Sequence, residues 1–298
     1  MVKVKAPGSC GELVQGTIDG KNFLITCPVN LYSIAEVVSD NRAPEQSHGV
    51  KVNKAVEKTL AYLNIKKQAF NLTVTTNLPV GKGMASSSAD ISAVCQAIAL
   101  SNGSLLTPDE VADIALAIEP TDAVFYPGIV MFDHVNGLIR SNLGSPPSIH
   151  IAVFDVGGEV DTLGFNLRSD LNKLNKAKET QVHYALKLVT EGLKTNNAKM
   201  IGHGATISAL ANQSVLFKPS LESIIKISAD YNAAGVNAAH SGTVIGVMFD
   251  LSSLQNSVQC IEAICKAHPE VTYLETVKLI SGGLLQLEGD SNNWIECF

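Results

Sequence analysis

Residues 79–90 combine glycines, serines and a lysine in the way that a phosphate-binding loop requires. The segment follows a strand-like run and opens a helical pattern, and Gly81 and Gly83 allow close approach and backbone conformations that a side chain would block. Three serines, residues 86–88, fall in the first helical turn, where unpaired backbone N–H groups and the positive end of the helix dipole favour an anion. Lys82 adds positive charge, and the serine hydroxyls can ligate Mg²⁺ held by the phosphates of a nucleotide. The segment therefore predicts a site for a polyphosphate.

Two common nucleotide-binding motifs are excluded at this loop. The spacing GxxxxGK(S/T) of a Walker A motif is absent, and so is the glycine fingerprint of a Rossmann fold. The alternative is an ordinary glycine-rich turn that is capped by a serine and holds no ligand. The residues that we expect to contact the nucleotide are Pro79, Gly81, Lys82, Gly83, Met84, Ala85, Ser86, Ser87 and Ser88.

Strand and helix patterns alternate before the loop. Residues 24–29 and 31–38 are apolar, β-branched-rich runs separated at Pro28, which predicts two strands. Residues 50–63 carry apolar side chains at helical spacing, and residues 70–76 alternate apolar and polar side chains as a half-buried strand does.

The pattern after the loop continues with two helices and two short strands. Helical spacing that starts in the loop ends near residue 102, and a capping box then marks a new helix. In that box Thr107 is the N-cap, Pro108 takes the first helical position and Glu110 follows three residues after the cap. This helix should end near residue 118, and strands are predicted at residues 128–134 and 138–140.

The second half of the chain begins after a candidate linker. Residues 142–148 contain paired prolines and small polar residues, which favour a connection without regular structure. Beyond it we expect a strand at 149–155, helices at about 174–193, 197–212 and 219–234, a strand at 243–249, a helix at about 252–267 and a strand at 271–279. The mixed order of strands and helices predicts an α+β fold of two domains, residues 1–145 and 146–298.

Composition restricts the class of protein. The chain has 298 residues, 46% hydrophobic and 17% charged, so it can bury a large core and is not dominated by disorder. A formal net charge of -6 argues against a nucleic-acid partner. No apolar run reaches the roughly 18 residues of a membrane span, and the first residues lack the apolar stretch of a signal peptide, so we expect a cytoplasmic protein with no membrane partner. The six cysteines form no CxxC pair, so a structural zinc site is not indicated.

Three segments, in order along the chain, resemble the GHMP kinases. Residues 79–89 resemble the family's central phosphate loop, PxxxGLGSSAA, with Met84 for leucine, Ala85 for glycine and Ser88 for alanine. The Ala-Pro-Gly at residues 6–8 resembles the family's opening element, and the glycine-rich stretch 232–242 resembles its third motif. The resemblance implies a ribosomal S5 domain 2-like N-terminal ATP-binding domain and a ferredoxin-like C-terminal domain. It also implies phosphorylation of a small-molecule hydroxyl with ATP and Mg²⁺.

The resemblance assigns roles to two acidic residues. Asp122 lies in a stretch that resembles the one carrying the family's catalytic aspartate, where a carboxylate accepts the proton of the attacking hydroxyl. Glu119 is the candidate Mg²⁺ ligand together with Ser87, since one carboxylate and one hydroxyl suffice beside the phosphates. The alternatives are a turn-capping aspartate and a solvated glutamate at a helix end.

Two further segments are expected to contact the substrate. Residues 7–16 are interpreted as a polar loop in which Ser9, Glu12 and Gln15 face the substrate and Glu12 holds an ammonium group; a hairpin turn is the alternative. Many members carry a lysine where this chain has Ser9. His240, Ser241 and Gly242 are expected to form a loop that approaches the phosphates or the substrate; the alternative is a tight loop between buried elements. The other histidines, including His134, are expected to be surface or structural residues.

One branch of the family matches more narrowly. The pattern of residues 8–16, the Cys-Pro-Val at residues 27–29 and the Glu-Pro-Thr-Asp at residues 119–122 resemble the branch that makes O-phospho-L-threonine from ATP in cobalamin biosynthesis and propanediol utilisation. The implied partners are ATP and a hydroxy amino acid, and a homodimer stays open. The alternatives are phosphorylation of homoserine or an isoprenoid precursor, and a non-catalytic ligand sensor, for which the missing lysine is the argument.

Overall fold

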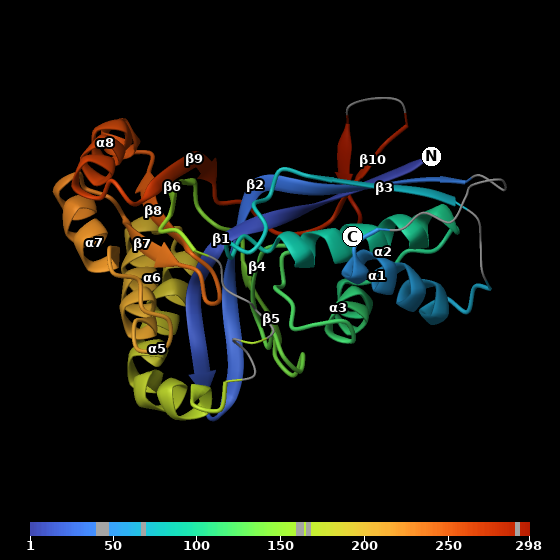
Figure 1. Cartoon of the computed structure of the whole chain (residues 1–298), viewed down its shortest axis with the longest axis horizontal. Coiled ribbons are helices and arrows are strands. Elements are labelled where there is room, and N and C mark those ends of the chain that lie inside the picture. Colours follow the sequence, from blue (N-terminus) through green and yellow to red (C-terminus); the bar gives the residue numbers. More distant parts are fainter. Residues whose placement is uncertain (40–47, 67–69, 159–163, 165–167, 290–292) are drawn as a thin grey trace.

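Two long antiparallel strands, β1 (Val2–Ile18) and β2 (Lys21–Ser39), run through both ends of the molecule (Figure 1). The computed structural model describes residues 1–39, 48–66, 70–158, 164, 168–289 and 293–298. The predicted break at Pro28 is wrong, because β2 continues through this residue. Pro28 pairs with Ser9 between two register shifts of β1, and such irregularities are where a sheet tolerates a residue without an N–H group.

A single sheet contains the strands that the structure describes. Its main order is β5-β4-β2-β1-β7-β8-β6-β9; β3 adds to β2, and β10 joins β1 to β11. The bounds are β3 Phe70–Thr76, β4 Ile129–Phe132, β5 Arg140–Gly144, β6 Ile149–Asp155, β7 Gly235–Ala238, β8 Val244–Asp250, β9 Thr272–Lys278, β10 Leu285–Leu287 and β11 Trp294–Glu296. The predicted linker at 142–148 is wrong in its first half, because β5 occupies residues 140–144.

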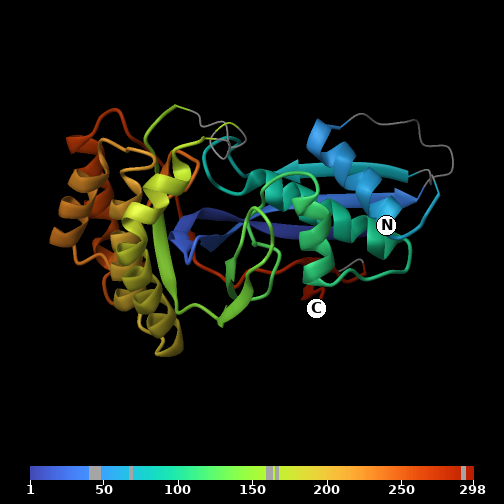
Figure 2. The same cartoon turned by 90° about the horizontal axis from the view of Figure 1, so that it is seen from below.

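Three helices cover one end of the sheet. They are α1 (Val50–Tyr62), α2 (Ser86–Ser101) and α3 (Pro108–Leu116), and Figure 2 shows them grouped together. The capping box is confirmed: the Thr107 hydroxyl accepts the Glu110 N–H, and the Glu110 carboxylate accepts the Thr107 N–H at 2.7 Å. Helix α2 is buried along most of its length. It therefore holds the residues of its first turn in a fixed place.

The second half has the order of a ferredoxin-like domain. Between β6 and β7 lie α5 (Leu171–Lys194), α6 (Ala198–Asn212) and α7 (Leu221–Asp230), and α8 (Ser257–Ala267) connects β8 to β9. These four strands pair antiparallel in the order β7-β8-β6-β9. The predicted helix at 219–234 runs too far, because it ends at Asp230 and the next residues lead into β7. The predicted α+β architecture is confirmed.

The two halves share the sheet and meet at strand β1. Near its start β1 pairs with β10, which brings the last residues of the chain back to the first half, and Val4 faces Gln286 there. Near its centre β1 pairs with β7, where Glu12 faces Ala238. The boundary at residues 145/146 therefore stays a prediction. Within the described ranges, no helix combines the length and the hydropathy that a membrane crossing needs.

Candidate active site

The loop before α2 is fastened from two sides. On one side β1 donates to it, from the Ser9 N–H to the Met84 carbonyl at 3.0 Å and from the Gly11 N–H to the Gly83 carbonyl at 3.2 Å. On the other side the Thr243 N–H donates to the Lys82 carbonyl at 2.9 Å. The loop is thus held between the first strand and the turn that precedes β8.

The start of α2 depends on a left-handed residue and on close backbone contact. Ala85, the N-cap, has φ 55°, which turns the chain so that Ser86 begins the helix. The backbones of Gly83 and Gly242 touch, since a Cβ added at Gly242 would lie 2.3 Å from the Gly83 Cα. Only glycine fits such an approach. The structure therefore brings together the second and third segments that the sequence singled out.

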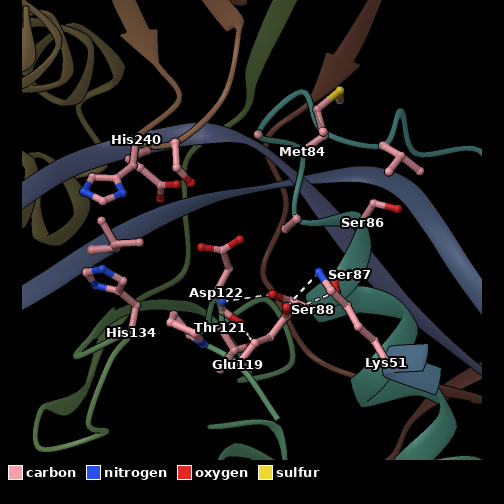
Figure 3. A pocket seen from close by; sticks show the side chains of 18 of the residues that line it. Lys51, Met84, Ser86, Ser87, Ser88, Glu119, Thr121, Asp122, His134 and His240 are labelled. Carbon is pink, nitrogen blue, oxygen red and sulfur yellow. Dashed lines mark hydrogen bonds and ion pairs between the residues drawn. The ribbon is translucent and has the colours of Figure 1, made fainter. Parts of the chain in front are cut away.

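A cavity of about 310 Å³ opens in front of this loop (Figure 3). Its walls come from β1, β2, α1, the loop, the first turn of α2, the segment after α3, the turn after β4 and the turn before β8. The lining residues are Glu12, Leu24, Lys51, Pro79, Val80, Gly81, Gly83, Met84, Ala85, Ser86, Ser87, Ser88, Glu119, Pro120, Thr121, Asp122, His134, His240 and Ser241. Most of the predicted site residues therefore surround one space.

One corner of the cavity has the oxygen ligands of a magnesium site. The Ser87 hydroxyl donates to one oxygen of the buried Glu119 carboxylate, and the Lys51 ammonium lies 2.7 Å from the other. A hydroxyl and a carboxylate are the hard donors that Mg²⁺ prefers beside nucleotide phosphates. The ammonium on Glu119 indicates that this corner accepts positive charge, so the residues present fit the ion.

Asp122 occupies the middle of the cavity. Its N–H donates to the Ser88 hydroxyl at 3.0 Å, and its side chain points into the open space (Figure 3). Burial raises the pKa of Asp122 to about 6, and the nearby Glu119 carboxylate adds to the rise. Burial, followed by the charge of Asp122, also raises the pKa of Glu12 well above its usual range. With a pKa of about 6, the Asp122 carboxylate is well suited to accept a proton near neutral pH.

Two histidines form the end of the cavity away from the serines (Figure 3). The rings of His134 and His240 meet edge to face with centroids 5.2 Å apart. Burial lowers the pKa of His240 well below its usual range, and the charges of His134, Lys178 and Lys218 lower it further. His134 was expected to be a surface or structural residue, but it lines the cavity. No spacing in the sequence pairs it with His240.

Lys51 is a second residue that sequence reasoning missed. It lies in the first turn of α1, where a positive charge is unfavourable because of the helix dipole. That position was the available signal that the lysine serves another purpose.

Four predicted site residues lie outside the cavity lining. The Lys82 ammonium lies 2.9 Å from the Asp155 carboxylate and donates to the Gly158 carbonyl at 2.7 Å. Gln15 is buried, and its side-chain amide donates to the Ala238 carbonyl at 3.1 Å. Ser9 lies in β1, and Gly242 packs against the loop backbone. Neither residue belongs to the cavity lining that the structure describes. The predicted loop at residues 7–16 is wrong: this segment is part of strand β1, which is irregular enough to aim Glu12 into the cavity.

Comparisons with known proteins agree with this arrangement. Residues 51–126 match the family described as GHMP kinases N terminal domain. An L-threonine kinase of Salmonella typhimurium is 34% identical over 250 residues, covering 83% of this chain and 82% of the relative. An L-threonine kinase of Citrobacter freundii is 32% identical over 254 residues, covering 84% and 87%. The crystal structure of homoserine kinase from Cytophaga hutchinsonii is similar with a TM-score of 0.71 at 18% identity, covering 96% of this chain and 97% of that one.

Proposed function

Because the chain belongs to the GHMP kinase family, we propose that it transfers the γ-phosphoryl group of ATP to the side-chain hydroxyl of L-threonine. The products are O-phospho-L-threonine and ADP. The observation that carries the proposal is the position of Asp122, a buried carboxylate in the same cavity as the loop and the first turn of α2. The names of the two relatives supply the acceptor.

The residues divide the chemistry between them. Backbone N–H groups of the loop and of the first turn of α2 receive the phosphates, which a helix start favours. Asp122 accepts the proton of the acceptor hydroxyl while the hydroxyl oxygen bonds to the γ-phosphorus. The bond from that phosphorus to the β–γ bridging oxygen breaks, and this oxygen leaves with ADP. Glu12 faces the same space and would hold the ammonium group of the acceptor. Phosphoryl transfer leaves little covalent work to the protein, so positioning and charge dominate.

Mg²⁺ is the proposed cofactor. Ser87 and Glu119 would hold it, and when bound it neutralises charge on the transferred phosphate. Lys51, whose ammonium lies 2.7 Å from the Glu119 carboxylate, would contact the phosphates beside this corner. A place in cobalamin biosynthesis, a homodimer and a cytoplasmic location stay predictions from the sequence.

The experiment that tests the proposal is ADP release with ATP and Mg²⁺ against a panel of acceptors. The panel contains L-threonine, L-serine, L-homoserine, D-threonine and mevalonate, and phosphorus NMR identifies the product. Turnover with L-threonine well above the others is expected. Preference for L-homoserine would keep the phosphate site and overturn the acceptor. Binding of ATP without turnover of any acceptor would favour a ligand sensor.

A further inference from the structure

Two lysine side chains are buried behind the histidine end of the cavity. Lys178 on α5 and Lys218 in the turn after α6 are each only 3% exposed. The Lys178 ammonium donates to the Asn212 side-chain carbonyl at 2.6 Å, and the Lys218 ammonium donates to the Ala239 carbonyl at 3.0 Å. Both acceptors are neutral oxygens.

Buried ammonium groups normally have a carboxylate partner, because burying a charge without one is unfavourable. None of the ion pairs between residues that the structure describes includes Lys178 or Lys218. Burial accordingly lowers the pKa of Lys178 to about 7 and that of Lys218 to about 8. The charged form of each lysine is therefore disfavoured here without a partner, and an anion bound nearby would stabilise it.

His240 connects this charge to the cavity. It lines the cavity and follows Ala239, whose carbonyl holds Lys218. Both lysines are close enough to affect the titration of His240. The carboxylates that line the cavity are Glu12, Glu119 and Asp122, and none of the ion pairs between described residues joins them to either lysine. The buried lysines therefore lie behind the histidine end without a carboxylate partner from the cavity lining that the structure describes.

An acceptor amino acid has an anionic group that this end fits. The phosphates of ATP belong at the first turn of α2, and Asp122 lies between that turn and the histidines (Figure 3). An acceptor whose hydroxyl meets Asp122 has its carboxylate left to place. We propose that the α-carboxylate of the acceptor binds at His134 and His240, with Lys178 and Lys218 supplying the positive charge behind them. This inference rests on the proposed function. It extends that function by explaining how the enzyme would prefer an acceptor with a free carboxylate to a neutral analogue without one.

The test compares L-threonine with L-threoninamide, which keeps the hydroxyl and the shape but has no carboxylate. The variants are Lys178→Met and Lys218→Met, and Lys176→Met is the control because it lies exposed on the same helix. In the wild type kcat/KM favours the acid. In each buried-lysine variant we expect this preference to fall about tenfold, through a higher KM for L-threonine, with L-threoninamide changed less than about threefold. The control keeps the wild-type preference.

Thermal denaturation separates this role from a structural one. Methionine replaces a buried charge with an apolar chain of similar length, so the variants should melt no lower than the wild type. If one variant fails to fold, the other still decides. An equal fall in kcat/KM for both substrates, or an unchanged preference, would overturn the subsite. Absence of turnover with L-threonine in the wild type would contradict the proposed function and not the subsite. The same variants would then be compared with L-homoserine and L-homoserinamide, and the same fall in preference for the acid is expected.

Discussion

Asp122 is the residue on which the proposed chemistry depends most directly. Replacement by asparagine keeps the size of the side chain and the bond from its N–H to Ser88, but removes the group that accepts the proton. We expect Asp122→Asn to lower kcat by about 10²–10⁴-fold, the usual contribution of a general base, with KM for ATP changed less than about threefold. Steady-state kinetics with both substrates varied will measure this. Unchanged turnover would remove Asp122 from the mechanism.

The same carboxylate should control the dependence of activity on pH. It accepts a proton only when ionised, and its pKa is raised to about 6 by burial and by Glu119. Activity is therefore retained above this pKa and lost as pH falls through it. Measured as kcat/KM for L-threonine with saturating ATP and Mg²⁺, the acid limb should lie at or below pH 6, because the added ion favours the carboxylate form. In Asp122→Asn this limb should disappear.

Lys51 supplies a cation at the mouth of the same cavity. Among the residues of the described cavity lining it is the sole lysine or arginine, and the same lining contains the carboxylates of Glu12, Glu119 and Asp122. Lys51→Met should raise KM for ATP by about tenfold, because a charge-assisted contact to phosphate is lost. Lys54→Met, an exposed neighbour on α1, is the control. Equal kinetics in the two variants would limit Lys51 to its pairing with Glu119.

The sequence identifies these residues unequally, for a physical reason. Asp122, Glu119 and Ser87 belong to short segments that resemble motifs of the GHMP kinases, and the resemblance implies their roles. Lys51 and His134 acquire their place only when α1 and the turn after β4 are brought to the loop, and that is decided by packing across the sheet.

At the scale of elements, the site depends on the contact between the loop and the turn before β8. Gly242→Ala puts a methyl group 2.3 Å from the Gly83 Cα, where backbone and not a flexible side chain must move. A displacement of about 1 Å in the loop can lower the rate about 10²-fold. We expect a loss of that order in kcat/KM for ATP and a lower melting temperature. Gly49→Ala is the control, since Gly49 has open space and an ordinary φ of -58°.

Elements with complete local signals were predicted, and elements without them were not. The capping box at Thr107 contains its own hydrogen-bond partners, so the helix start follows from four consecutive residues. Pro28 shows the opposite case. Its local preference predicts the end of a strand, but the pairing with β1 is irregular at this point, so the missing N–H group of proline costs no regular ladder hydrogen bond. The four-residue strand β7 is too short to show an alternation, and it forms because β8 and β1 lie beside it.

At the scale of the molecule, one sheet makes the site a joint product of both halves. Strand β1 contributes Glu12, the first half contributes α1, α2 and Asp122, and the second half contributes His240 and Ser241. The resemblance to the GHMP kinases implied a ferredoxin-like second half, and the strand order of that half confirms it. The sequence could not predict that the chain end returns to pair with β1, because strand partners far apart in sequence leave no local pattern.

The ion pair between Lys82 and Asp155 connects the loop to the second half. Each side chain is mostly buried, and the ammonium is also bonded to Gly158, so the structure makes Lys82 a fastening for the loop. If so, Lys82→Met and Asp155→Asn should each lower the free energy of unfolding by about 1 kcal/mol, and the double variant by little more. Both should leave KM for ATP within about threefold of the wild type. Denaturant unfolding and steady-state kinetics distinguish a fastening role of Lys82 from a contact with the phosphates of ATP. A phosphate contact would raise KM for ATP in Lys82→Met and leave KM for ATP unchanged in Asp155→Asn.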